Sequence, residues 1–163
     1  MYYSNRIIKE IRDIEEDPAA KIGIKATDNT NQYYATIIGP PDTPYEGGTF
    51  LVNIQLEDDF PFKPPKMRFI TKVYHPNISS QTGAICLDIL KDAWSPALSI
   101  RTALLSLQSL LSSPVPDDPQ DAQVASHYKN NYKDFFSTAK HWTESYANGN
   151  LENIDEQISN GNI

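Results

Sequence analysis

Cys86 is the single cysteine of the chain, and it lies in a stretch rich in prolines and polar residues. The thiolate form of cysteine is a strong nucleophile, and a free thiol with a pKa of about 8.5 is partly ionised at neutral pH. A protease-like cysteine also needs a histidine base, and His75 is the histidine nearest to it in the sequence. Spacing alone does not bring the two side chains together. A packed, inert thiol and a reactive nucleophile therefore both stay open at this point.

Other sequence patterns that carry chemistry are absent. The histidines and the cysteine show no HxxxH pair or His/Cys cluster with metal-ligand spacing, so we predict no metal site. The glycine-rich phosphate-binding patterns GxxxxGK(S/T) and GxGxxG do not occur, and neither does GxSxG, the nucleophile elbow of serine hydrolases. A single cysteine cannot form an internal disulfide. The thiol is therefore the strongest candidate for catalysis.

The composition is typical of a soluble globular protein, and a length of 163 residues favours one domain. The formal net charge is −7, which disfavours binding to nucleic acid or to anionic membranes. No segment approaches the roughly 18–20 apolar residues of a membrane helix, and the N-terminus lacks the features of a signal peptide. We therefore expect a cytoplasmic protein, with the nucleus as a second location.

Hydrophobic periodicity predicts the helices that frame the cysteine segment. Residues 4–16 place isoleucines at helical spacing, with Ser4 as the N-cap and with Arg6, Lys9 and Glu10 on the other faces. Residues 99–112 have a broad apolar face, which is typical of a central core helix. A short helix near 122–128, capped by Asp121 or a neighbour, and a last helix at about 132–147 follow.

Between the first two helices the period changes to two. Residues 22–26, 50–56 and 67–69 alternate, and residues 33–38 are a run of residues typical of strands, which together predict an antiparallel meander of three or four strands. Residues 60–95 have no long periodic run, and such stretches in small domains are commonly functional. The order of helix, strands, long loop and helices is an α+β layout. Residues 148–163 contain five Asn, three acidic residues and no Lys or Arg, which predicts a disordered or partly helical tail.

Six motifs in order resemble the ubiquitin-conjugating enzymes over residues 4–147. The motifs are GPPDTPYEGG at 39–48, FPFKPPK at 60–66, HPN at 75–77, GAICLDIL at 83–90, WSPAL at 94–98 and PDDP at 116–119. The resemblance implies a ubiquitin-conjugating fold with four helices and four strands, in which residues 1–147 form the catalytic core domain. It also implies that Cys86 carries ubiquitin as a thioester.

The same resemblance assigns roles around the thiol. Cys86 would accept ubiquitin from the activating enzyme, and Asp88 and Asp118 would orient the incoming lysine amine. Asn77 would either stabilise the oxyanion of the tetrahedral intermediate or hold the loop by hydrogen bonds to backbone. His75 and Pro76 are expected to be structural. Asp118 and its neighbour Asp117 could instead end the loop and cap the next helix.

Partner surfaces follow from matching positions in the family. Phe62, Pro96 and Ala97 would face RING- or HECT-type ubiquitin ligases, although Phe62 could also be a core residue beneath its loop. Arg6 and Lys9 would contact ligases and the activating enzyme. On the central helix, Leu105 and Ser109 lie four residues apart on one face and would contact the donor ubiquitin. These two form the last set of expected contacts.

The resemblance implies no bound cofactor, because the upstream activating enzyme uses the ATP, and it implies a monomeric core acting on protein substrates. The motifs look most like the subclass with a C-terminal ubiquitin-associated domain, which builds chains that lead to the proteasome. We expect that domain to be absent or truncated here, because the residues after the last predicted helix are too few for it. Three alternatives stay open: conjugation of a ubiquitin-like modifier, a non-enzymatic interaction module of the same fold, and a redox thiol protein.

Overall fold

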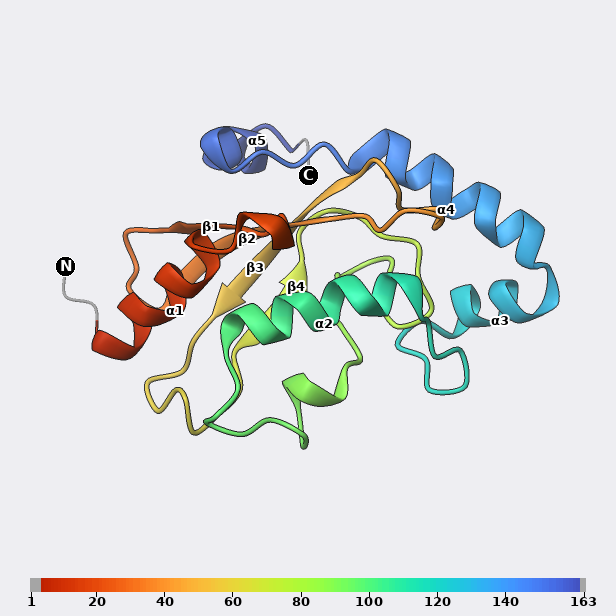
Figure 1. Ribbon diagram of the computed structural model, residues 1–163. Helices are drawn as coiled ribbons and strands as arrows, with labels where there is room; N and C mark the ends of the chain where they lie inside the picture. The colour runs from red at the N-terminus through yellow and green to blue at the C-terminus, as the bar shows by residue number, and fades with distance from the viewer. Residues whose placement is uncertain (1–3, 162–163) are drawn as a thin grey trace.

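The computed structural model describes residues 4–161. Its centre is a four-stranded antiparallel sheet in the order β1-β2-β3-β4, with β1 at Gly23–Ala26, β2 at Gln32–Ile38, β3 at Thr49–Gln55 and β4 at Lys66–Phe69. Helix α2, Ile100–Ser112, runs across one face of this sheet (Figure 1). The α+β meander expected from the alternating residues is confirmed.

The remaining helices surround this centre. Helix α1 spans Asn5–Glu15, α3 spans Ala122–Asn130, and α4 spans Tyr132–Tyr146. Short helical turns lie at Pro18–Ala20, Asp88–Leu90 and Leu151–Asn153. In Figure 1, α1 lies at one side of the sheet, and α3 and α4 lie at the other. The segment that carries Cys86 contacts two of these helices, because His75 bonds to the Leu110 carbonyl of α2 and Ser80 bonds to Asp121 at the start of α3.

The core forms where the sheet meets α2. Phe50, Val52 and Ile54 point to the same side of β3 and are fully buried, as alternation along a strand requires. Ala103, Leu104 and Leu107 on α2 are also fully buried. The apolar residues predicted for these two elements thus pack together in one core. Burial of such side chains contributes about 1.5–3 kcal/mol each.

Three helices begin at capping side chains, of which Ser4 and Asp121 were predicted from the sequence. Ser4 Oγ accepts from the Ile7 backbone N at 3.2 Å, and Ser99 Oγ accepts from the Thr102 backbone N at 3.0 Å. Asp121 Oδ1 accepts from the Val124 backbone N at 3.2 Å and so caps α3. Each cap satisfies an N–H in the first helical turn, where no intrahelical acceptor exists.

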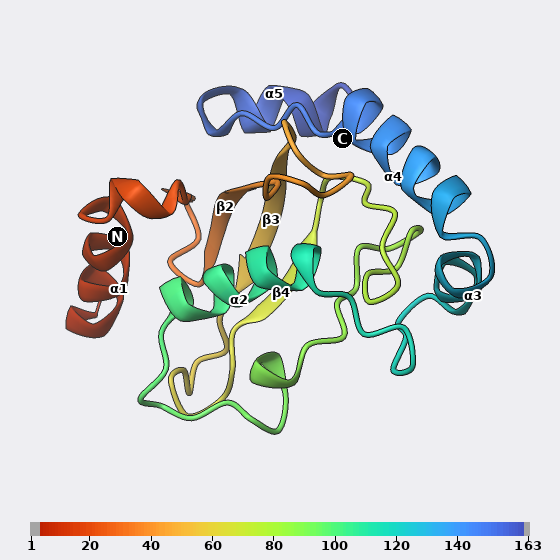
Figure 2. The ribbon, with the colours of Figure 1, turned by 45° about the vertical axis from the view of Figure 1, so that its right-hand side comes forward.

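The described part of the tail is folded against the sheet. The backbone N of Gly149 donates to the Thr49 carbonyl at 3.0 Å, which extends the pairing of β3 past α4. A short helix, α5, spans Ile154–Ser159, and Ile154 is fully buried. Figure 2 shows α5 beside the end of the sheet where β3 begins. The composition left disorder and partial helix open, and the described residues are partly helical.

Candidate active site

A tight hairpin carries Cys86 next to the residues of the HPN motif. Ile78 pairs with both His75 and Ile85 through isolated bridges, and the Cys86 backbone N donates to the Asn77 carbonyl at 2.9 Å. The thiol is half-buried. The two motifs that are nine residues apart in the sequence therefore lie side by side, with the cysteine at the end of the hairpin.

Gly83 fixes the turn of this hairpin. Its φ is +78°, and a Cβ at this position would lie 2.0 Å from the Phe69 carbonyl oxygen. The backbone N of Phe69 in turn donates to the Gly83 carbonyl at 2.9 Å. Both the left-handed conformation and the close approach to β4 require glycine.

His75 lies beneath the hairpin and is fully buried. Its Nδ1 accepts from the Asn77 backbone N at 2.9 Å, and its Nε2 donates to the Leu110 carbonyl at 2.7 Å. That carbonyl lies in the last turn of α2, where its usual partner would be the N–H of residue 114, which is a proline. Burial lowers the pKa of His75 to about 4. Both ring nitrogens are engaged, so His75 is not a base for Cys86 in this arrangement.

The Asn77 side chain holds the loop that follows α2. Its Nδ2 donates to the carbonyls of Val115 and Asp118, both at 2.9 Å, and its Oδ1 accepts from the Val115 backbone N at 2.8 Å. Both N–H groups of the amide are used in these bonds. Donation to an oxyanion would require one of them to be released, so the geometry favours the loop-holding role of the two roles predicted for Asn77.

The sulfur of Cys86 lies between opposite charges. Asp118 Oδ2 and Lys91 Nζ are each 3.7 Å from Sγ, and both side chains are exposed. Asp118 therefore lies beside the thiol, which is the position that the resemblance implies for it. Sequence reasoning did not single out Lys91, although its position five residues after the cysteine was a signal for it.

The other predicted acidic residues lie further out on the rim. Asp88 begins the short turn after the cysteine, where its Oδ1 accepts from the Ile89 backbone N at 2.8 Å, and no hydrogen bond joins its side chain to Cys86. Asp117 pairs with Lys129 at 2.5 Å. Its carboxylate is thus directed toward α3 rather than the thiol.

Asp121 ties α3 to the hairpin. Its Oδ2 accepts from Ser80 Oγ at 2.6 Å and from the Ser80 backbone N at 3.0 Å. Burial alone would raise the pKa of Asp121, but hydrogen bonds from Ser80 and from the backbone amides of Val124 and Gln123 outweigh it and lower the pKa. The backbone N of Asp121 also donates to the carbonyl of Pro76 at 3.0 Å. The HPN motif is thereby joined to the start of α3.

The expected ligase-facing residues Phe62, Pro96 and Ala97 are all exposed. Phe62 is 78% exposed, which excludes a core position. Arg6 instead turns inward, because its guanidinium donates to the carbonyls of Pro96 at 3.0 Å and Leu98 at 2.7 Å. These two hydrogen bonds from Arg6 thus hold the 96–98 loop in place.

One prediction about α1 is wrong. Glu10 was placed on the polar side of the helix, but its side chain is buried, whereas Ile8 is 43% exposed. Glu10 accepts from Arg6 Nε at 2.7 Å and from the Ile100 backbone N, at the start of α2, at 2.9 Å. A carboxylate is stable there because a helix N-terminus offers free N–H groups and a positive dipole end. The signal was the spacing of Ile7, Glu10 and Ile14, which share one face.

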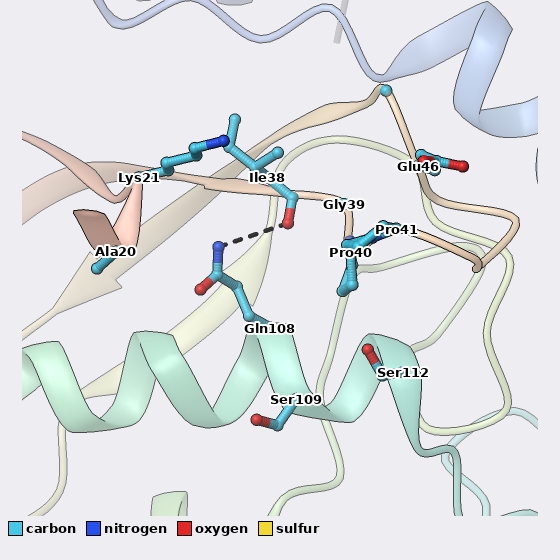
Figure 3. A pocket seen from close by; sticks show the side chains of 11 residues that line it. Ala20, Lys21, Ile38, Gly39, Pro40, Pro41, Glu46, Gln108, Ser109 and Ser112 are labelled. Atoms are coloured by element: carbon cyan, nitrogen blue, oxygen red, sulfur yellow. Dashed lines mark hydrogen bonds between the residues drawn. The ribbon is translucent and has the colours of Figure 1, made fainter. Parts of the chain in front are cut away.

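Leu105 and Ser109 line a groove between α2 and the segment after the cysteine. The groove has a volume of about 390 Å³ and also contacts Leu87 and Asp88. On its other side, Ser109 borders a second hollow of about 540 Å³ toward Gly39 (Figure 3). Gln108 reaches across that hollow to the Ile38 carbonyl at 3.4 Å. The two predicted donor-contact residues therefore face open space next to the thiol segment.

Within residues 4–161, no group of three or more His, Cys, Asp or Glu side chains is placed to hold a metal ion. The helices in that same range are all too short or too polar to cross a bilayer.

Known proteins share this fold and much of this sequence. The family model described as "Ubiquitin-conjugating enzyme" matches residues 6–143. Ubiquitin-conjugating enzyme E2 27 of Arabidopsis thaliana is 58% identical over 146 residues, which are 88% of this chain and 76% of the relative. Ubiquitin-conjugating enzyme E2 K of Homo sapiens is 53% identical over 143 residues, which are 87% of this chain and 72% of the relative.

A solved structure gives the same answer for the fold. The E2 domain of a Toxoplasma gondii ubiquitin conjugating enzyme superposes with a TM-score of 0.83 and is 52% identical, and the match covers 87% of this chain and 97% of that domain. The fold and the sequence identity agree over a range of the chain that includes Cys86. The chain belongs to the ubiquitin-conjugating enzyme family.

Proposed function

We propose that this enzyme accepts ubiquitin from the activating enzyme as a thioester on Cys86 and, with a ubiquitin ligase, transfers it to a lysine amine. The observation that carries the proposal is the placement of the Cys86 sulfur at an open rim, 3.7 Å from the Asp118 carboxylate and from the Lys91 ammonium. An inert structural thiol would lie in apolar surroundings instead. The neighbouring charges suit a sulfur that reacts.

The first step is an exchange between thioesters. The Cys86 thiolate attacks the carbonyl carbon at the C-terminus of ubiquitin, and the thiolate of the activating enzyme leaves. In the second step a neutral lysine amine attacks the new thioester, the C–S bond breaks, and Cys86 is released as the thiolate. The amine gives up one proton in this step, which passes to the released thiolate or to solvent. Asp118 lies where a carboxylate can accept a hydrogen bond from the amine and so orient it.

The groove beside α2 is the proposed site for the end of the donor ubiquitin. It runs along Leu105 and Ser109 to Leu87, the residue that follows the cysteine. A C-terminal peptide lying there would arrive at the sulfur in a defined direction. Holding the reacting carbonyl in a fixed geometry contributes to the rate because the entropy is lost on binding rather than in the reaction.

The exposed residues Phe62, Pro96 and Ala97 are the proposed ligase-facing surface, and RING-type and HECT-type ligases are the proposed partners. An exposed aromatic ring and a proline in short loops lose little entropy on docking. The Arg6 hydrogen bonds to the carbonyls of Pro96 and Leu98 support this, because they fix the loop before any partner arrives. Lys9, which pairs with Asp13 at 2.8 Å, remains the proposed basic contact on α1.

The proposed product is the type of ubiquitin chain that leads to proteasomal degradation. Support comes from the motif resemblance to the subclass with a ubiquitin-associated domain and from the similarity to E2 K. Conjugation of a ubiquitin-like modifier is the alternative for the same chemistry.

A charging assay with activating enzyme, ATP and ubiquitin tests the proposal. The wild-type chain should form one adduct that thiol reductants cleave, and Cys86→Ser should form an oxyester that survives them. Charging of Cys86→Ala would overturn the proposal. Parallel assays with ubiquitin-like modifiers identify the modifier, and linkage-resolved mass spectrometry of the products identifies the chain type.

A further inference from the structure

A serine or threonine stands directly before a proline at three places in the chain, at Thr43, Ser95 and Ser113. Protein kinases of the proline-directed class modify a hydroxyl in this context. Proline has no backbone N–H, so it suits a binding site that offers no acceptor to the residue after the hydroxyl, where any other residue would leave its N–H unpaired. The sequence pattern is the same at all three places, but the structure separates them.

Two of the three residues are held by the fold. Thr43 Oγ1 donates to the Pro40 carbonyl at 2.7 Å, and the proline that follows Thr43 is buried. Ser113 is the C-cap of α2, so the residues before it are helical and include the buried Leu110 and Leu111. A kinase needs the acceptor residue and its neighbours in an extended, accessible form. Neither segment can adopt that form without disturbing the core.

Ser95 is accessible. It is exposed, and residues 91–97 lie outside the helices and strands, with none of them buried. Among residues 4–161, no hydrogen bond engages Ser95 Oγ. The proline after it favours extended backbone at Ser95. Its carbonyl accepts from the Leu98 backbone N at 3.0 Å, which places the serine at the first position of an exposed turn.

Hydrogen bonds on both sides of Ser95 place it in the proposed ligase-facing surface. Trp94 Nε1 donates to the Pro61 carbonyl at 2.8 Å, so Ser95 and Phe62 are the next residues along the chain from the two that this bond joins. The residue after Ser95 is held by the Arg6 guanidinium at 3.0 Å. The two loops lie side by side at the lower left of Figure 2. A group added to the Ser95 hydroxyl would therefore belong to the same surface as the Phe62 ring.

We propose that Ser95 is a phosphorylation site for a proline-directed kinase and that its phosphate prevents a ligase from docking. The inference rests on the proposed function, because it takes Phe62, Pro96 and Ala97 as the ligase-facing surface. In the modification step, Ser95 Oγ attacks the γ-phosphorus of ATP. The bond between that phosphorus and the bridging oxygen of ADP breaks, ADP leaves, and the hydroxyl proton passes to a base of the kinase.

The phosphate opposes docking through its charge. A phosphoserine carries about −1.5 to −2 charges at pH 7, and it disrupts an apolar interface in which it would be buried. The Arg6 guanidinium is not free to neutralise it, because its nitrogens donate to Glu10 and to the carbonyls of Pro96 and Leu98. If Arg6 turned to the phosphate, the loop would lose the bonds that hold it. Both arrangements weaken the docking surface.

The first experiment asks whether the folded chain is a substrate. The full chain is incubated with ATP and purified kinases of the cyclin-dependent and mitogen-activated classes, and peptide mass spectrometry locates the phosphate. We expect it at Ser95 and not at Thr43 or Ser113. Ser95→Ala should abolish the modification, and Ser113→Ala should keep it. Phosphate found only at Thr43 or Ser113, or no phosphate with any of these kinases, would overturn the site.

The second experiment measures what the phosphate does. Phosphoserine is incorporated by stop-codon suppression at position 95 and, as the matched control, in place of Ser145, which is exposed on α4, on the other side of the sheet from α1 (Figure 1). Each protein is first charged fully with ubiquitin. Discharge onto free lysine is then titrated with a RING domain that stimulates the unmodified chain, and each rate is divided by the rate of the same protein without that domain.

The Kd of the RING domain from this titration should rise about ten- to hundredfold with phosphoserine at position 95, the size expected for burying a polar group without a partner. Phosphoserine at position 145 should leave it unchanged. Equal Kd values for the unmodified and the phosphoserine-95 proteins, or tighter binding of the latter, would overturn the phosphate as a barrier to docking. Equal weakening at both positions would also overturn it, because net charge would then be responsible.

The outcomes are distinct from a failure of the proposed function. Absence of a thioester on Cys86 in the unmodified chain would contradict the proposed function, and the kinase reaction would still decide whether Ser95 is modified. A normal thioester together with an unmodified Ser95 would overturn this inference and leave the proposed function standing.

Discussion

The active site has a buried side, which we call the underside and which contains His75 and Asn77, and an open side, which we call the rim and which contains Cys86, Asp118 and Lys91. The two sides make different interactions. On the underside, His75 and Asn77 are at most 1% exposed and direct every side-chain N and O atom to a backbone partner. On the rim, Asp118 Oδ2 and Lys91 Nζ each lie 3.7 Å from the Cys86 sulfur, and neither charge has another side-chain partner among the described residues. The underside keeps the loops in place, and the rim is free to react. Substitutions beneath should therefore lower stability, and substitutions on the rim should lower activity.

Asn77→Ala tests the underside most severely. It removes three hydrogen bonds and leaves backbone groups of Val115 and Asp118 without their partner. At about 1 kcal/mol for each bond, we expect a loss of roughly 3 kcal/mol in the free energy of unfolding. Urea denaturation gives the value, and hydrogen exchange should show faster exchange in residues 113–121. Asn130→Ala, on the exposed side of α3, is the control.

A loss of transfer rate without a loss of stability in Asn77→Ala would contradict the assignment of Asn77 to the underside. If Asn77→Ala kept its stability but transferred ubiquitin 10²–10³-fold more slowly, the amide would be an oxyanion donor of the usual magnitude. Asn77 would then belong to the rim in function although it lies beneath it.

His75 makes the stability of the underside depend on pH. Its pKa is about 4 in the folded state and about 6.5 in an unfolded chain, so the unfolded state takes up a proton first as pH falls. The free energy of unfolding should drop by about 3 kcal/mol between pH 6.5 and pH 4 and then level off for this group. His75→Gln keeps a donor and an acceptor but cannot titrate. Denaturation of both proteins across this range should show a drop that is about 3 kcal/mol larger in the wild type, and parallel curves would contradict the assignment.

Asp118→Asn tests the rim. Its carboxylate is exposed, and the backbone carbonyl that Asn77 uses is unchanged, so the free energy of unfolding should change by less than about 0.5 kcal/mol. The thioester should still form, but its discharge onto free lysine should slow by roughly 10²-fold. Asp117→Asn, one residue earlier and paired with Lys129, should discharge normally. A loss of stability without a loss of rate would place Asp118 with the underside.

Phe62→Ala extends the contrast to the proposed ligase surface and has the smallest expected effect on stability. A side chain that is 78% exposed contributes little to folding, so the free energy of unfolding should stay within about 0.5 kcal/mol. Binding of a RING domain, followed by isothermal titration calorimetry, should weaken. Tyr132→Ala removes another exposed aromatic ring, on α4, and should bind the RING domain as the wild type does. Equal weakening in both variants would argue against a specific surface at Phe62.

The sequence was most informative where structure is local. Helix α1 begins at the predicted cap Ser4 and helix α3 at the predicted cap Asp121, because a cap and its first turn lie within four residues. The strands were recognisable from alternation for the same reason. Cys86 and Asp118 could be located by motif, and the fold brings them together across 32 residues.

Contacts that depend on tertiary structure could not be found in this way. The pairing of Glu10 with the Ile100 backbone N spans 90 residues, and that of Asn77 with Val115 spans 38. No period or spacing in the sequence records such a partner. Charged residues such as Glu10 are seldom buried, so only its place on the apolar stripe marked it as different. For Lys91 the missing information was the direction of its side chain, which depends on the turn at Asp88–Leu90.

Helix α2 is held at both ends by side chains from other elements. Glu10 accepts from the backbone N of Ile100 at its start, and His75 donates to the Leu110 carbonyl near its end. At 1.5 Å per residue, the ten residues between these contacts span about 15 Å. These hydrogen bonds fix the position of both ends of α2, the first near the 96–98 loop and the second beneath the HPN motif. A displacement at the first end cannot make the helix slide along its axis, so it must tilt α2 or displace the HPN motif.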